Sequence, residues 1–166
     1  MDDSAPEAAT APVAPPPGNH STWMRLAWLA SGAPVASSRD ASGAVAVRCE
    51  GSQQPRLLML ASGQDTRTAL AELVVQAARN GVSLREAHCY HWPLISSKVD
   101  FRQLLDCGIK AVYTPELAIP KRLAEVNSVV RWEASCMGVQ MRSLSIAAVF
   151  GPLRGSLCDG VGEIHD

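Results

Sequence analysis

The sequence has little charge and no excess of either sign. Only 19% of its 166 residues are charged, and 15 Lys and Arg stand against 16 Asp and Glu, which gives a formal net charge of -1. Proteins that bind phosphate backbones need a basic surface, so this balance argues against nucleic acid as a partner. Hydrophobic residues make up 47% of the chain, enough for one sizeable core. With so few charges to form a solvated shell, we expect partner subunits to cover part of the surface.

Long apolar runs and a basic leader are also missing. No apolar stretch reaches the roughly 18 residues that a membrane span requires, and no Lys or Arg precedes Arg25. We therefore expect no membrane segment, no targeting peptide and a cytoplasmic location. The five cysteines are scattered and never stand at CxxC spacing, which argues against a disulfide framework or a local zinc clip.

Composition divides the chain into three parts. Residues 1–20 are mostly Ala, Pro and acidic residues, which cannot repay the entropy of being ordered, so we expect a disordered tail there. Residues 21–150 have the apolar periodicity of one folded domain. Residues 151–166 are rich in Gly and lack periodicity, which predicts a flexible C-terminal tail.

Apolar periodicity and turn residues predict the elements of that domain. We expect helices at residues 21–30, 66–80, 97–107 and 131–143, with Ser21 or Thr22 capping the first, and strands at 43–48, 56–60, 86–92, 110–113 and 145–150. The first two strands, joined by a polar turn, predict an antiparallel hairpin. A later strand, helix and strand in succession predict a parallel crossover. The expected fold class is therefore α/β, with a mixed five-stranded sheet.

Five segments within roughly residues 21–150 carry a resemblance to a known family. They are an opening helix at 23–30 (WMRLAWLA), a first strand at 43–47 (GAVAV), 77–84 (AARNGVSL), 107–113 (CGIKAVY), and a late helix containing Arg131, Trp132 and Met141. Together these segments resemble the zinc-dependent cytidine and deoxycytidylate (dCMP) deaminase superfamily. The resemblance implies a cytidine-deaminase-like three-layer α/β/α fold, a zinc-bound water as nucleophile, and oligomers built on this scaffold.

The residues that perform the chemistry of that family are absent from the matching positions. The family's H-x-E falls on Thr68 and Leu70, so a threonine replaces a zinc ligand and a leucine replaces the proton-transferring acid. In one alignment register the family's P-C-x-x-C falls on residues 96–100, so Ser97 and Asp100 replace its two cysteines. In a second register it falls one residue earlier, on residues 95–99. Neither register contains a cysteine.

A shifted alignment does not restore the site. No histidine lies between His20 and His88, and no cysteine lies between Cys89 and Cys107. Without zinc the attacking water keeps a high pKa, and without the glutamate nothing carries the proton to the leaving ammonia. We therefore expect no zinc or other cofactor, no catalytic residue, and degenerate positions at Thr68, Leu70, Ser97 and Asp100.

Two other readings of these residues stay open. His88, Cys89 and His91 are close in sequence, and a relocated metal site at Cys89 and His91, helped by Cys49 or Cys107, is the alternative to buried strand residues. Hydroxyls and a cation at a helix start suit a phosphate, so Ser96, Ser97 and Lys98 are candidate nucleotide-binding residues. Simple capping by Ser96 or Ser97, with Asp100 completing a capping box, competes with that role.

Three functions follow from these expectations. The first is a catalytically inactive deaminase-like protein that serves as structural or regulatory subunit, either with copies of itself or with an active relative. The second is a sensor that binds a pyrimidine nucleotide such as dCMP or dCTP without converting it. The third is an active enzyme, a hydrolase that deaminates a cytosine nucleotide with a rearranged site.

Overall fold

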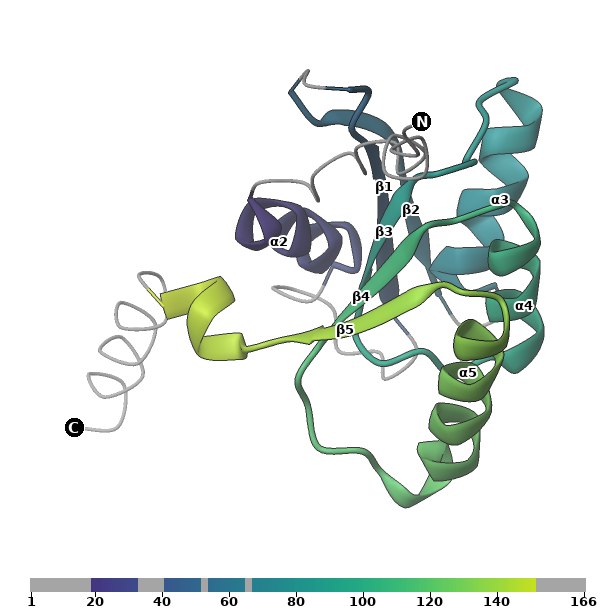
Figure 1. The fold of residues 1–166 in the computed structure, drawn as a ribbon. Helices are drawn as coiled ribbons and strands as arrows, with labels where there is room; N and C mark the ends of the chain where they lie inside the picture. Colours follow the sequence, from purple (N-terminus) through teal and green to yellow (C-terminus); the bar gives the residue numbers. More distant parts are fainter. Residues whose placement is uncertain (1–18, 33–40, 52–53, 65–66, 152–166) are drawn as a thin grey trace, which may run out of the picture.

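The computed structural model of the protein describes residues 19–32, 41–51, 54–64 and 67–151. These residues form a five-stranded sheet with helices on both faces. The strand order is β2-β1-β3-β4-β5. Helices α3, α4 and α5 cover one face, and α2 and the helical residues 146–151 lie on the other (Figure 1). The expected α/β fold with a mixed five-stranded sheet is thus confirmed. The predicted tails fall almost wholly on residues 1–18 and 152–166, outside the described ranges.

The first strands form the predicted hairpin. Strand β1 (Ser42–Arg48) pairs antiparallel with β2 (Arg56–Gly63) on one side and with β3 (His88–Trp92) on the other. Its run of small and β-branched side chains is buried on both faces, as a central strand requires. Strands β3, β4 (Ala111–Pro115) and β5 (Gln140–Leu144) are parallel.

Three helices cover one face of the sheet, and side-chain caps mark the starts of two of them. Helix α3 (Ala69–Arg79) is capped by Thr68 and ends at Asn80 and Gly81, the latter with a φ of 65°. Helix α4 (Lys98–Asp106) is capped by Ser97. Helix α5 (Ala124–Cys136) follows a 3-10 turn, η1 (Lys121–Leu123). One core cluster joins the apolar sides of these helices to β1, β3 and β4.

On the opposite face, helix α2 (His20–Ala30) lies against β1 and β3. Asn19, not Ser21 or Thr22, caps this helix, because its side chain accepts the Thr22 N–H at 3.1 Å. The helix reaches the sheet closely at Gly43, where an added Cβ would lie 2.0 Å from the Ala27 carbonyl oxygen. Glycine is therefore required at this crossing.

The C-terminal elements correct two expectations. Residues 131–143 do not form one helix: α5 starts at Ala124 and ends at Cys136, and Gly138, with a φ of 70°, turns the chain into β5. Residues 145–150 are not a strand, because residues 146–151 are helical and pack beside α2. Phe150 contacts Trp28 and Trp92 edge-on there, at ring-centroid distances of 5.1 and 5.7 Å.

Candidate functional site

The topology brings the starts of two helices to one edge of the sheet. Strand β2 ends beside the start of β1, with Gly63 opposite Ser42, so the following helix α3 begins at this edge. Helix α4 follows the end of β3, which is antiparallel to β1, and therefore begins at the same edge. Polar groups at Thr68 and Ser97 thus come close together although 29 residues separate them. This edge is the candidate site.

A hydrogen bond connects the two helix starts. The hydroxyl of Thr68 donates to Asp100 Oδ2 at 2.7 Å and accepts the Ala71 N–H at 3.2 Å, so the same side chain caps α3 and holds α4. Ser97 caps α4 by accepting the Asp100 N–H at 3.2 Å. The capping role is confirmed, but the Asp100 carboxylate turns to Thr68 and does not complete a capping box within α4.

Leu70, two residues after Thr68, lies in the core. Its side chain is 1% exposed and belongs to the cluster that includes Leu73 of the same helix and Phe101 of α4. An aliphatic side chain neither binds nor transfers a proton. The position therefore provides packing for the helix pair.

A cavity of about 130 Å³ opens at the same edge, where β1 begins and β3 and β4 end. Its walls are mostly apolar, and Ser42, Ser96 and Arg122 add polar groups. Ser42 Oγ accepts the buried Ala69 N–H at 3.0 Å, which fixes the first turn of α3 against β1. Sequence reasoning missed Ser42 and Arg122, since Arg122 lies in a stretch without periodicity and reaches the cavity through tertiary structure alone.

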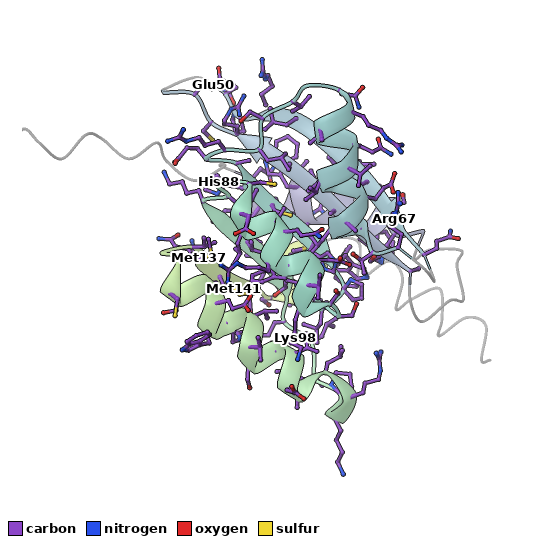
Figure 2. All side chains as sticks on the ribbon, turned by 90° about the vertical axis from the view of Figure 1, so that its right-hand side faces the viewer. Glu50, Arg67, His88, Lys98, Met137 and Met141 are labelled. Carbon is purple, nitrogen blue, oxygen red and sulfur yellow. The ribbon has the colours of Figure 1, made fainter. Side chains whose placement is uncertain are left out.

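The three candidate nucleotide-binding residues separate in the structure. Ser96 lines the cavity, and Ser97 caps α4. Lys98 lies on the outer side of the helix pair (Figure 2), where its Nζ pairs with Glu125 Oε1 of α5 at 3.1 Å. A ligand in the cavity would therefore meet Ser96 and Arg122 before Lys98.

The histidines and cysteine of β3 occupy both faces of the strand. His88 Nδ1 lies 2.9 Å from the Tyr113 hydroxyl, in a stack of rings where Tyr90 and Tyr113 are 4.5 Å apart. His91 Nδ1 lies 2.7 Å from the Pro93 carbonyl oxygen. Burial lowers the pKa of His91 to about 4, with an opposing effect from the Pro93 carbonyl, and raises the pKa of the Cys89 thiol to about 12.

A metal centre requires several ligands that converge on one point. Within the described ranges, no three His, Cys, Asp or Glu side chains are grouped closely enough to hold a metal ion. In the same ranges, no helix is long and apolar enough to cross a membrane.

Comparison with known proteins finds similarity in structure but not in sequence. No family model and no curated protein sequence matches the chain. The dCMP deaminase of cyanophage S-TIM5 superposes with TM-scores of 0.54 in its apo form and 0.57 in complex with dCMP and dUMP, at 17% identity. The two superpositions cover 78% of this chain and, respectively, 100% and 99% of the phage protein.

A second similar structure is a larger protein from Thermotoga maritima. It is a diaminohydroxyphosphoribosylaminopyrimidine deaminase/5-amino-6-(5-phosphoribosylamino)uracil reductase, with a TM-score of 0.54 and 16% identity over 74% of this chain and 35% of that one. At such identities the likeness concerns the fold. The chain has a cytidine-deaminase-like fold.

Proposed function

We propose that this protein is a catalytically inactive deaminase-fold protein that acts as a structural or regulatory subunit of an oligomer. The Thr68–Asp100 hydrogen bond is the observation that supports this proposal most strongly. The two residues stand where the sequence resemblance puts a histidine and a cysteine ligand of zinc, and their side chains pair with each other.

The donor set does not fit zinc. Structural and catalytic zinc sites use thiolates, imidazoles and carboxylates in tetrahedral arrangement. The neutral hydroxyls of Thr68 and Ser97 are not among these ligands, and the one carboxylate, Asp100, already accepts a hydrogen bond. We therefore derive no catalytic step through a metal. Leu70 also offers no group to shuttle a proton between water and base.

A deamination assay tests this proposal. Purified protein is incubated with dCMP, cytidine and a cytosine-containing oligonucleotide, and the uracil products are quantified beside an active deaminase as positive control. We expect no product above the protein-free background. Steady product formation that is lost in an Arg122→Ala or Ser97→Ala variant would support the alternative of a rearranged active site and overturn the proposal.

The cavity supports a second candidate, the binding of a pyrimidine nucleotide without turnover. Ser96 and Arg122 offer a hydroxyl and a cation at the mouth of an apolar cavity, a combination that suits a phosphorylated ligand. Titration calorimetry with dCMP and dCTP tests this role. Binding that weakens at least about tenfold in Arg122→Gln, but not in the exposed Arg79→Gln, favours the sensor, and no heat with either nucleotide rejects it.

A further inference from the structure

Helix α2 crosses the sheet at an angle. At its C-terminal end, the Ala30 carbonyl oxygen accepts the hydroxyl of Ser62, near the end of β2, at 2.6 Å. At its N-terminal end, the His20 ring lies 4.8 Å from the ring of Tyr113 on β4, three strands farther along the sheet. The N-terminal half of the helix therefore leaves the first half of β2 uncovered on this face.

The uncovered part of β2 is apolar. Leu60 stands opposite Val45 of β1 in the register of the hairpin, and Leu57 stands opposite Val47. Both valines belong to the core cluster on the α2 face, so the two leucines share that face. Leu57 is 44% exposed and Leu60 is 41% exposed. Exposed apolar side chains that gather on one face mark a contact surface.

Trp23 borders this surface from the helix. The opposite flank of α2 is occupied, because Arg25 Nε donates to the Val149 carbonyl of the helical residues 146–151 at 2.8 Å. Trp23 is rotated by about 200° from Arg25 around the helix and stands two turns before Ala30, so it lies on the flank that faces β2. Its Nε1 is shielded from water and donates to no described residue. A buried indole N–H ordinarily has an acceptor.

The chain that leads into α2 offers acceptors of the right kind. Residues 12–18 read PVAPPPG and end next to Asn19, the cap of the helix. Proline has no N–H, and its fixed φ favours the extended polyproline II conformation, whose carbonyl groups make no hydrogen bonds within the segment. Surfaces lined by aromatic rings bind such segments, and an indole N–H is a donor for their carbonyls.

The dimensions and the entropy also suit this segment. Trp23 stands about one helical turn after Asn19, so the preceding residues reach it without crossing a long distance. Residues 12–18 span about 22 Å as polyproline II, and the 8 residues of β2 span about 26 Å. A proline run has little backbone freedom before it docks, so ordering it costs less free energy than ordering an ordinary segment.

We propose that residues 12–18 dock on Trp23, Leu57 and Leu60 of the same chain as a polyproline II segment. A carbonyl within residues 15–17 accepts the Trp23 indole N–H. The torsion that orients an indole ring is broad, so a small turn of the ring presents the N–H to this acceptor. The docking goes beyond the proposed function and does not depend on it.

Hydrogen exchange of the Trp23 indole N–H, followed by NMR on the isotope-labelled full chain, tests the docking. The variant Trp23→Phe assigns the resonance. We expect exchange to become at least about tenfold faster when Pro15→Gly, Pro16→Gly and Pro17→Gly are combined, because this variant keeps the length of the chain but loses the preference for polyproline II. Circular dichroism and the melting temperature establish that each variant is folded.

The surface of β2 is tested in the same way. Leu60→Ser should also accelerate the exchange of the indole N–H, because it removes part of the apolar contact. Ile119→Ser is the matched control, since Ile119 is 46% exposed and lies in the loop between β4 and η1. Pro6→Gly is the control within the tail, outside the docking segment. Both controls should exchange at the rate of the unaltered chain.

The outcomes decide which segment occupies the surface. Exchange as slow in the triple proline variant as in the unaltered chain overturns the docking. Exchange that slows as the protein concentration rises from about 50 to 500 μM shows that the tail of a second copy occupies the surface, and overturns docking within one chain. Neither result bears on deamination, which the separate assay decides.

Discussion

The hydroxyl of Thr68 lies 2.7 Å from the carboxylate of Asp100, and this hydrogen bond ties the first turn of α3 to the first turn of α4. Both helices begin at the same edge of the sheet. In a zinc site the metal itself would cross-link the two helix starts. Here we infer that a hydrogen bond between side chains performs the cross-linking, and the stability of the edge should depend on it.

Thr68→Val tests this cross-link. Valine has nearly the same shape but neither donates to Asp100 nor accepts the Ala71 N–H, so we expect a loss of about 2 kcal/mol in the free energy of unfolding. Thr68→Ser keeps both hydrogen bonds and should lose less than about 1 kcal/mol. Urea unfolding followed by circular dichroism gives both values. Equal stability of Thr68→Val and the unaltered chain would show that the hydrogen bond contributes nothing.

Leu70→Glu reintroduces the glutamate of the family's H-x-E motif at the matching position. We expect this variant to be less stable and to remain inactive. The side chain is 1% exposed, so the substitution buries a carboxyl group among apolar neighbours and costs roughly several kcal/mol. Ala78→Glu, on the exposed side of the same helix, is the control and should change stability little. A melting temperature of Leu70→Glu that matches this control would contradict the core position of Leu70.

Two buried histidines predict a loss of stability in acid. Burial lowers the pKa of His91 to about 4, and burial together with Lys110 and His20 lowers the pKa of His88 to about 4, against an ordinary value of 6.5. The unfolded chain binds protons more readily, so this stability is complete above pH 6.5 and disappears as the pH falls toward 4. Each lowered histidine pKa contributes roughly 3 kcal/mol at most to the free energy of unfolding.

The free energy of unfolding, measured by urea titration from pH 8 to pH 4, checks this dependence. His91→Asn should flatten the profile between pH 6.5 and pH 4, because it removes one of the two buried histidines whose pKa is lowered to about 4. The other histidine and the carboxylates keep titrating in this variant. A profile as steep in His91→Asn as in the unaltered chain would contradict the assigned shift.

Gly43→Ala tests the close contact between α2 and the sheet. The added Cβ would lie 2.0 Å from Ala27 O and 2.6 Å from Ser31 N, both backbone atoms that cannot move independently of the helix. We expect a loss of about 1–3 kcal/mol or more in the free energy of unfolding. Gly151→Ala, where a Cβ meets nothing within 4 Å, is the matched control. A variant at Gly43 as stable as this control would place α2 farther from β1.

The central elements of the fold were predictable because their signals are local. The run of helix formers that ends at Asn80-Gly81 predicted α3 with errors of three residues at its start and one at its end, and two short apolar runs joined by a polar turn predicted β1 and β2. The C-terminal third was not predictable in the same way. Strand β5 (QMRSL) has few apolar residues and is mostly exposed, so its pairing with β4 determines its conformation.

The run SIAAVF shows the converse problem. A short apolar segment is compatible with either a buried strand or a helix. Residues 146–151 form a helix here, because they pack against α2. In the candidate site, the sequence indicated the capping by Ser97, whereas the Thr68–Asp100 contact joins residues 32 apart and arises from the topology. Met137-Gly138 was an available stop signal for α5.

The zinc content of the purified chain tests the central claim most directly. After expression with zinc in the medium and dialysis against a mild chelator, inductively coupled plasma mass spectrometry gives the number of zinc ions per chain. We expect much less than one, because Thr68, Ser97 and Asp100 supply one carboxylate and neither a thiolate nor an imidazole. One zinc per chain, reduced in an Asp100→Asn variant that remains folded, would contradict the account.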